Sequence, residues 1–323
     1  MPSRPSSRSF TLVEVLVAVA LAILLLAALF SMMGQVSGVW RRSTGSIEAF
    51  QGARVGFDLM GRNLSQATLN AYVDYDNATN PAYYLRKSDL RFVVGAAGNG
   101  IPGTAGTGQA VFFQAPLHNV STASRTSLDT LLNTCGYYVS FTTNATVPAH
   151  VAGTLNPYRY RLMQMLVPSE GNTIYGCTTN PAVIDNTWFT GAVPLGNVVP
   201  VADNVILLLV RAQDPAAAAP DLTSDYTYDS ALGALANPQP VTAQQLPPVL
   251  QLTMVAIDEA TSRRLAAGST PPPAIAAALA GKFQKPSSYQ ADLDQLQAAL
   301  ASARIPYRVF SSMVPLRESK WTK

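Results

Sequence analysis

One acidic residue lies at the start of the longest apolar stretch of this chain, and its position demands a chemical partner. Glu14 follows Phe10 and Thr11, and from Val15 to Met33 the only polar residue is Ser31. A carboxylate deep in a bilayer costs roughly 2.5 kcal/mol or more, so it needs a neutralising group. The pattern therefore predicts an apolar segment with a single charge available for pairing.

The residues around this acid resemble a known processing signal. Phe10-Thr-Leu-Val-Glu14, followed by about twenty apolar residues, is similar to the cleavage and methylation signal of type IV pilins and pseudopilins. The resemblance implies that a prepilin peptidase cuts between Ser9 and Phe10 and that the new amine of Phe10 is methylated. It also implies that Glu14 pairs with the amine of a neighbouring subunit, which would neutralise both charges. Ser9 stands where this signal usually has glycine.

Two ordinary targeting segments share some of these features. A secretory signal peptide has a basic start and an apolar run, and Ala20-Leu-Ala22 resembles its cleavage site. A plain signal anchor would keep the same apolar run without cleavage. The run is longer than the usual 7–15 residues of a signal peptide, and it contains Glu14. Both features favour the prepilin interpretation.

The resemblance implies a location and a set of partners. Residues 1–9 would be a cytoplasmic leader, and Arg4 and Arg8 fit the rule that positive charges stay inside. Residues 10–33 would cross the bacterial inner membrane once, with the C-terminal part in the periplasm or on a cell-surface filament. Expected partners are the prepilin peptidase, other pilins or pseudopilins, the inner-membrane assembly platform, and membrane lipid before assembly.

The only two cysteines, Cys135 and Cys177, would lie in that oxidising compartment. We expect a disulfide between them, which would stabilise the fold by about 4 kcal/mol in the chain-entropy model. The alternative is a pair of unpaired, buried thiols.

The rest of the sequence offers few candidates for a catalytic or cofactor-binding site. The two histidines, His118 and His150, come without a Cys/His cluster at zinc-ligand spacing. No nucleophile comes with an obvious base, so we expect no catalytic residue, no cofactor and no enzyme. Acidic residues do gather in one stretch, where a solvated loop is expected and a calcium site is the alternative: Asp214, Asp221, Asp225 and Asp229.

Net charge argues against nucleic acid as the main partner. The formal charge of +3 falls to +1 once the leader is removed, too little for binding driven by bulk charge. A tip pilin that acts as an adhesin or in DNA uptake would need a local basic patch, such as Tyr83–Arg91 with Arg86 and Lys87. A further alternative is a monomeric, membrane-anchored scaffold.

Helical periodicity continues beyond the apolar segment. A stripe at three- and four-residue spacing, including Trp40, Phe57 and Leu64, predicts a helix from Phe10 to Ala67 of roughly 87 Å. Residues 34–70 would form its amphipathic half. Residues 71–323 change to short β-like runs separated by turns, so the fold class is α+β, with the long helix packed on an antiparallel sheet.

The predicted strands have runs of aliphatic and aromatic residues. The strand Val205–Arg211 is expected to be central in its sheet, because Val205–Val210 is continuously apolar. Leu293, Leu296 and Leu300 predict a late helix. The predicted strands are Leu90–Val94, Ala110–Gln114, Tyr137–Thr143, Tyr158–Leu166, Val205–Arg211, Val249–Ile257 and Pro306–Val314.

A wider resemblance covers most of the chain. The order of elements is similar to J-type minor pseudopilins of type II secretion, and three stretches resemble the pilin-like Verru_Chthon cassette protein C: Ala53–Asn70, Leu246–Glu259 and Tyr307–Phe310. This resemblance implies a structural, minor pseudopilin-like subunit of a type IV pilus or a type II secretion-type filament, assembled through its N-terminal helix.

Overall fold

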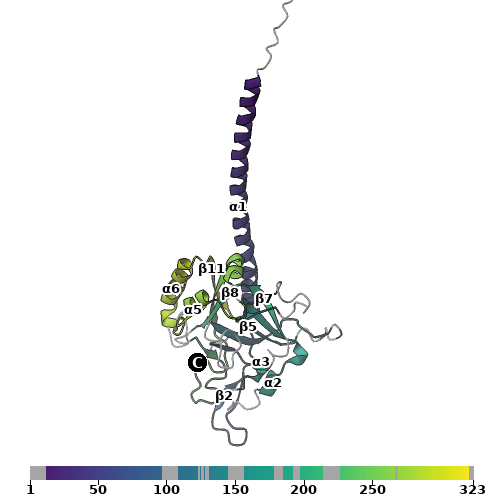
Figure 1. The fold of residues 1–323 in the computed structure, drawn as a ribbon. Helices are drawn as coiled ribbons and strands as arrows, with labels where there is room; N and C mark the ends of the chain where they lie inside the picture. The colour runs from purple at the N-terminus through teal and green to yellow at the C-terminus, as the bar shows by residue number, and fades with distance from the viewer. Residues whose placement is uncertain are drawn as a thin grey trace, which may run out of the picture. The chain divides into compact units, whose positions relative to one another are not determined.

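The computed structural model contains an N-terminal helix and a β-rich part with several short helices (Figure 1). The chain divides into two units, residues 1–48 and residues 49–323. Within helix α1, side chains are not described at residues 14, 15, 18, 27, 28, 31 and 34–49. The described residues are 12–96, 108–122, 124, 127, 131–144, 156–177, 185–191, 197–213, 226–265 and 268–319.

Helix α1 comprises Leu12–Leu64. Its sequence is rich in leucine and alanine and has no proline, which favours a helix. The helix ends before the predicted Ala67, because the Ser65 hydroxyl donates to the carbonyl of Arg62 and the Ala67 amide donates to that of Leu64. Such local bonds compete with continued helix hydrogen bonding.

The larger sheet has six antiparallel strands in the order β7-β6-β5-β4-β3-β9. The predicted strands at β4, β5 and β6 are confirmed within a few residues, whereas β7 and the short β9 were not predicted. The bounds are β3 Val93–Ala96, β4 Gln109–Ala115, β5 Asn133–Thr142, β6 Arg159–Val167, β7 Val198–Asp203 and β9 Tyr228–Asp229.

A second antiparallel sheet has the order β11-β10-β8. Its strands are β8 Val205–Ala212, β10 Val249–Ile257 and β11 Tyr307–Pro315. The predicted central position of β8 is wrong, since β10 is the middle strand. Strand β8 is buried because it packs against β4, β5 and β6 of the larger sheet.

Short elements complete the fold (Figure 1). A two-stranded antiparallel hairpin, β1 Tyr72–Tyr75 and β2 Tyr84–Lys87, follows α1. Helix α6, Tyr289–Ser302, buries the predicted stripe of leucines, and Tyr289 contacts both Arg211 of β8 and Thr253 of β10. The remaining helices are η2 Ser169–Gly171, α2 Ile174–Cys177, α3 Thr187–Thr190, α4 Glu259–Leu265, α5 Pro273–Leu279 and η4 Pro286–Ser288.

Alternation along the strands of the larger sheet separates two apolar clusters. One face packs against the Ala53–Leu64 part of α1 and the smaller sheet, and it includes Cys135 and Tyr137 of β5. The other face packs against α2 and α3 and includes Tyr138 of the same strand. The α+β class with antiparallel sheets is therefore confirmed.

Candidate functional site

The first half of α1 presents apolar side chains that nothing within the described part of the chain covers. Leu12, Phe30 and Met33 are 81%, 71% and 69% exposed, respectively. Contiguous apolar surface of this extent is rare on soluble monomers and marks contact with another apolar partner. The other exposed large apolar side chains of this stretch are Val13, Leu16, Val17, Val19, Leu21, Ile23, Leu24, Leu25, Leu26, Leu29 and Met32.

The residues predicted to be processed lie at the start of this segment. Ser9 and Phe10 lie outside the described residues. Glu14 is the third residue of α1, but the structure does not describe its side chain. Cleavage, methylation and pairing of these residues therefore stay predictions. Among the described residues, no helix has both the length and the apolar character needed to cross a bilayer.

A buried polar cluster joins the end of α1 to the larger sheet. The side-chain amide of Asn63 donates to the Tyr137 hydroxyl at 2.7 Å, and that of Gln164 donates to the same hydroxyl at 2.9 Å. Burial, the largest cause, raises the pKa of Tyr137, so the phenol stays neutral. The cluster fixes α1 over β5 and β6, because leaving any of these buried groups unpaired would cost free energy.

The expected Cys135–Cys177 disulfide does not form in the structure, where both thiols are free. Cys135 belongs to the cluster on the α1 face of the larger sheet, whereas Cys177 packs against the cluster on the opposite face. Two thiols on opposite faces of a sheet cannot reach the geometry of a disulfide. Burial raises the pKa of Cys135 to about 12, so its thiol is unreactive.

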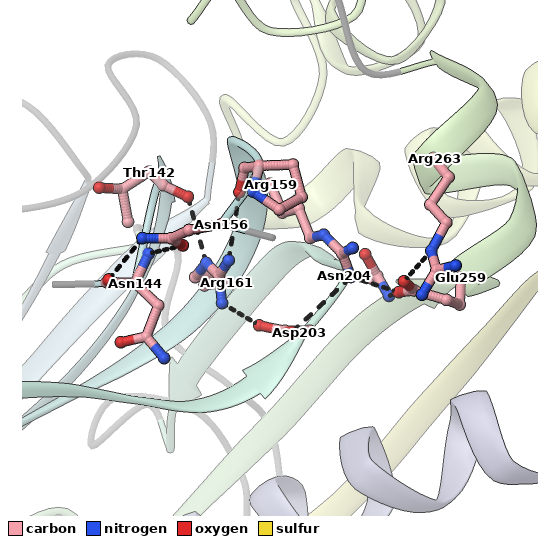
Figure 2. A network of polar contacts seen from close by, with 10 residues as sticks. Thr142, Asn144, Asn156, Arg159, Arg161, Asp203, Asn204, Glu259 and Arg263 are labelled. Atoms are coloured by element: carbon pink, nitrogen blue, oxygen red, sulfur yellow. Dashed lines mark hydrogen bonds and ion pairs between the residues drawn. The ribbon is translucent and has the colours of Figure 1, made fainter. Parts of the chain in front are cut away.

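A network of ionic side chains connects the larger sheet to the corner that leads into the smaller one (Figure 2). Arg161 of β6 contacts the Asp203 carboxylate, and Arg159 contacts that of Glu259 in α4. Asn204, which turns the chain from β7 to β8 with a φ of 62°, also donates to Glu259 at 2.7 Å.

The charged side chains of this network are partly buried, and the contacts between them affect their pKa values. Burial by itself would raise the pKa of Glu259, but hydrogen bonds from Asn204, Arg263 and Arg159 outweigh it and lower the pKa below its ordinary value. Burial is the main cause that lowers the pKa of Arg161. The arrangement can fix the angle between the two sheets.

At the edge of the network, a pair of amides closes the β5–β6 connection (Figure 2). The Asn156 side chain exchanges two 2.7 Å hydrogen bonds with the backbone of Asn144. The sequence analysis predicted the strand that carries Arg159 and Arg161 but not the ion pairs that these residues form. Their partners, Asp203 and Glu259, are distant in the sequence.

The predicted basic patch is engaged in internal contacts. The Arg91 side chain is 4% exposed and pairs with Asp229 in β9, and Lys87 pairs with Asp74 at 2.8 Å. Arg86 donates to the carbonyls of Pro240 and Ala243.

Asp229 is also one of the four acids considered for calcium, and its carboxylate is bound by Arg91. Asp214, Asp221 and Asp225 lie outside the described residues. No group of three or more potential metal ligands forms among the described residues. His118 is described and His150 is not.

Comparison with known protein families identifies the N-terminal segment. Residues 4–30 match the family described as the prokaryotic N-terminal methylation motif, a range that contains Ser9, Phe10 and Glu14. No curated protein matches the chain. The match and the exposed apolar side chains of α1 occur in the same stretch, so this chain carries a prepilin-type signal at its N-terminus.

Proposed function

We propose that this chain is a structural, non-enzymatic, pilin-like subunit of a type IV pilus or a type II secretion-type filament. The observation that carries the proposal is the methylation motif at residues 4–30, which overlaps the first part of α1, where the described large apolar side chains are exposed. A helix that stays uncovered in one copy needs a lipid environment or copies of similar helices. A pilin-like subunit would lie in lipid before assembly and would pack against the helices of other subunits in the filament.

The proposed sequence of events begins in the bacterial inner membrane. Residues 10–33 anchor the chain with its N-terminus in the cytoplasm, and the prepilin peptidase cuts between Ser9 and Phe10. The Phe10 amine is then methylated and pairs with Glu14 of a neighbouring subunit when the helix leaves the bilayer. In an apolar environment each of these charges is costly alone, so pairing favours the assembled state.

The β-rich part would be carried on the outside of the filament. Its attachment to α1 supports this role, because Phe57 of α1 contacts Phe310 of β11 at 5.9 Å and Asn63 is bonded to Tyr137. Pulling on the helix would therefore move the sheets with it. We also propose that the chain is a minor subunit, because it resembles Verru_Chthon cassette protein C and the J-type minor pseudopilins.

Mass spectrometry of the N-terminus of the protein from its native host tests the processing step. We expect a chain that begins with N-methylated Phe10. A chain that keeps Met1, or one cut after Ala22, would contradict the proposal.

Substitution of Glu14 tests the assembly step. We expect Glu14→Ala to remain inserted in membranes and folded but to enter filaments poorly. The matched control is Asp58→Ala, which removes an acid from an exposed position of the same helix, 63% exposed and 3.9 Å from Arg54. Normal filament entry by the Glu14 variant, or equal loss in both variants, would count against pairing through Glu14.

A further inference from the structure

A pocket of about 230 Å³ lies between the β1–β2 hairpin and two segments that follow much later in the sequence. Pockets for drug-sized ligands measure about 300–1,000 Å³, so this one suits a smaller molecule. Strand β2, labelled in Figure 1, forms part of its wall. The pocket is lined by Leu69, Ala71, Tyr72, Val73, Arg86, Gln244, Gln245, Leu246 and Glu318.

One lining residue has the features of a ligand-binding group. The residue Gln244 is only 6% exposed, and its side-chain amide makes no hydrogen bond to another described residue. The amide is not among the fully buried polar groups that lack a partner, so it stays accessible, and as part of a lining residue it can donate to and accept from a molecule in the pocket. The Gln244 backbone has a φ of 56°, and its N–H donates to the Ser230 carbonyl. Such strain in a residue other than glycine tends to occur at functional sites.

Two opposite charges line the same pocket. Arg86 lies directly across the hairpin from Val73, and its guanidinium is fixed by bonds to the carbonyls of Pro240 at 2.7 Å and Ala243 at 3.3 Å. Glu318, in the turn after β11, is exposed and forms no ion pair with the described residues. The pocket therefore offers a fixed cation, an available carboxylate and an available amide.

The rest of the lining is mostly apolar. Leu69, Ala71 and Val73 alternate along one stretch of chain, and Leu246 belongs to the segment facing them. These side chains suit an aliphatic or small aromatic group, which would gain free energy on leaving water.

We propose that this pocket binds a small zwitterionic ligand, an α-amino acid with an apolar side chain. The ligand carboxylate would contact Arg86, its ammonium group would contact Glu318, and the Gln244 amide would bond to either group. The apolar side chain would lie against Leu69 and Leu246. A site with paired charges rejects analogues that lack one charge, because a protein group is then left without its partner.

Isothermal titration of the full chain in detergent micelles tests this assignment, with L-leucine as the probe. Isocaproate lacks the ammonium group of leucine, and isoamylamine lacks its carboxylate. We expect leucine to bind with a micromolar to millimolar dissociation constant and each analogue to bind about tenfold more weakly or worse. No heat of binding for leucine at millimolar concentrations, or equal binding of an analogue, would overturn the proposal.

Two variants connect binding to the named residues. Gln244→Gly removes the amide but suits the positive φ, so the protein should melt no lower than the wild type while losing about tenfold in leucine affinity. The matched control is Arg304→Gly, which changes a residue with a φ of 55° that does not line the pocket and should keep full affinity.

Glu318→Gln should weaken leucine binding by about tenfold without changing the melting temperature, since Glu318 is exposed. It should leave the already weak binding of isocaproate unchanged. Unaltered leucine affinity in either pocket variant would overturn the assignment.

Discussion

Arg159 and Glu259 form an ion pair that connects strand β6 of the larger sheet to the first turn of α4, directly after β10 of the smaller sheet. The Arg159 side chain is 12% exposed, and Asn204 and Arg263 donate to the same carboxylate. Three donors on one partly buried carboxylate indicate that the pair is more than a surface contact, because exposed pairs rarely contribute more than about 1 kcal/mol.

We expect Glu259→Gln to lower the free energy of unfolding by about 1–3 kcal/mol, since Arg159 would remain partly buried without its counter-charge. Urea unfolding followed by circular dichroism measures this change. Asp58→Asn, at an exposed pair with Arg54, is the control and should change stability by less than about 0.5 kcal/mol. Equal effects in the two variants would show that the network adds nothing to stability.

Stability should depend on pH through the same carboxylate. The pKa of Glu259 is lowered in the folded state from its ordinary value of 4.5, so the folded protein binds fewer protons there than the unfolded chain. The stabilisation is therefore complete above pH 4.5 and decreases as the pH falls through the folded pKa. Unfolding free energies measured from neutral to acidic pH should fall less steeply in Glu259→Gln. Asp74, Asp76 and Asp185 also have lowered pKa values and contribute equally to both proteins. Parallel curves would contradict this assignment.

The hydroxyl of Tyr137 should matter far more than that of its neighbour in the sequence. Tyr137→Phe leaves the amides of Asn63 and Gln164 without their shared acceptor, which should destabilise the protein by about 1–3 kcal/mol. Tyr138→Phe is the matched control, because Tyr138 lies on the opposite face of the sheet and has no side-chain hydrogen bond among the described residues. Similar unfolding midpoints for the two variants would mean that the cluster does not hold α1 in place.

Sequence patterns predicted the strands and helices that carry a clear run or stripe of apolar residues. The apolar run of β10 was placed at its observed bounds, Val249–Ile257. Strand β7 was missed because Pro200 interrupts it and only one of its residues is buried, and β1 was missed because all four of its residues are exposed. The apolar periodicity of a segment indicates which of its residues are buried, but it does not show which other segments pack against them.

The same limit explains the errors at the candidate sites. The sequence around Arg161 does not reveal its ion pair, because its counter-charge, Asp203, is distant in the sequence. Cys135 and Cys177 were paired by compartment and number, yet the side of the sheet on which each lies depends on strand register and on the position of α2. The N-terminal signal was readable because its residues are contiguous.

The two thiols should differ in reactivity and should not pair. We expect iodoacetamide to modify Cys177 in the native protein and to leave Cys135 unmodified, because Cys135 is fully buried with a pKa of about 12. Peptide mass spectrometry after labelling distinguishes the two, and labelling in denaturant should modify both. Isolation of a peptide pair joined by a disulfide from the native protein would refute the free-thiol arrangement.

Two glycines should respond in opposite ways to the addition of one methyl group. Gly136 of β5 lies opposite Phe112 of β4, and a Cβ there would overlap the Phe112 ring. That ring stacks on Phe189 at 4.2 Å and cannot easily move, so Gly136→Ala should destabilise the protein by about 1–3 kcal/mol or more. A Cβ added at Gly52 of α1 would meet nothing within 4 Å, so Gly52→Ala should stabilise the helix by about 0.5–1 kcal/mol. Thermal unfolding of both variants tests the packing of the larger sheet on α3, because a neutral Gly136→Ala would mean that Phe112 has room to shift away from β5.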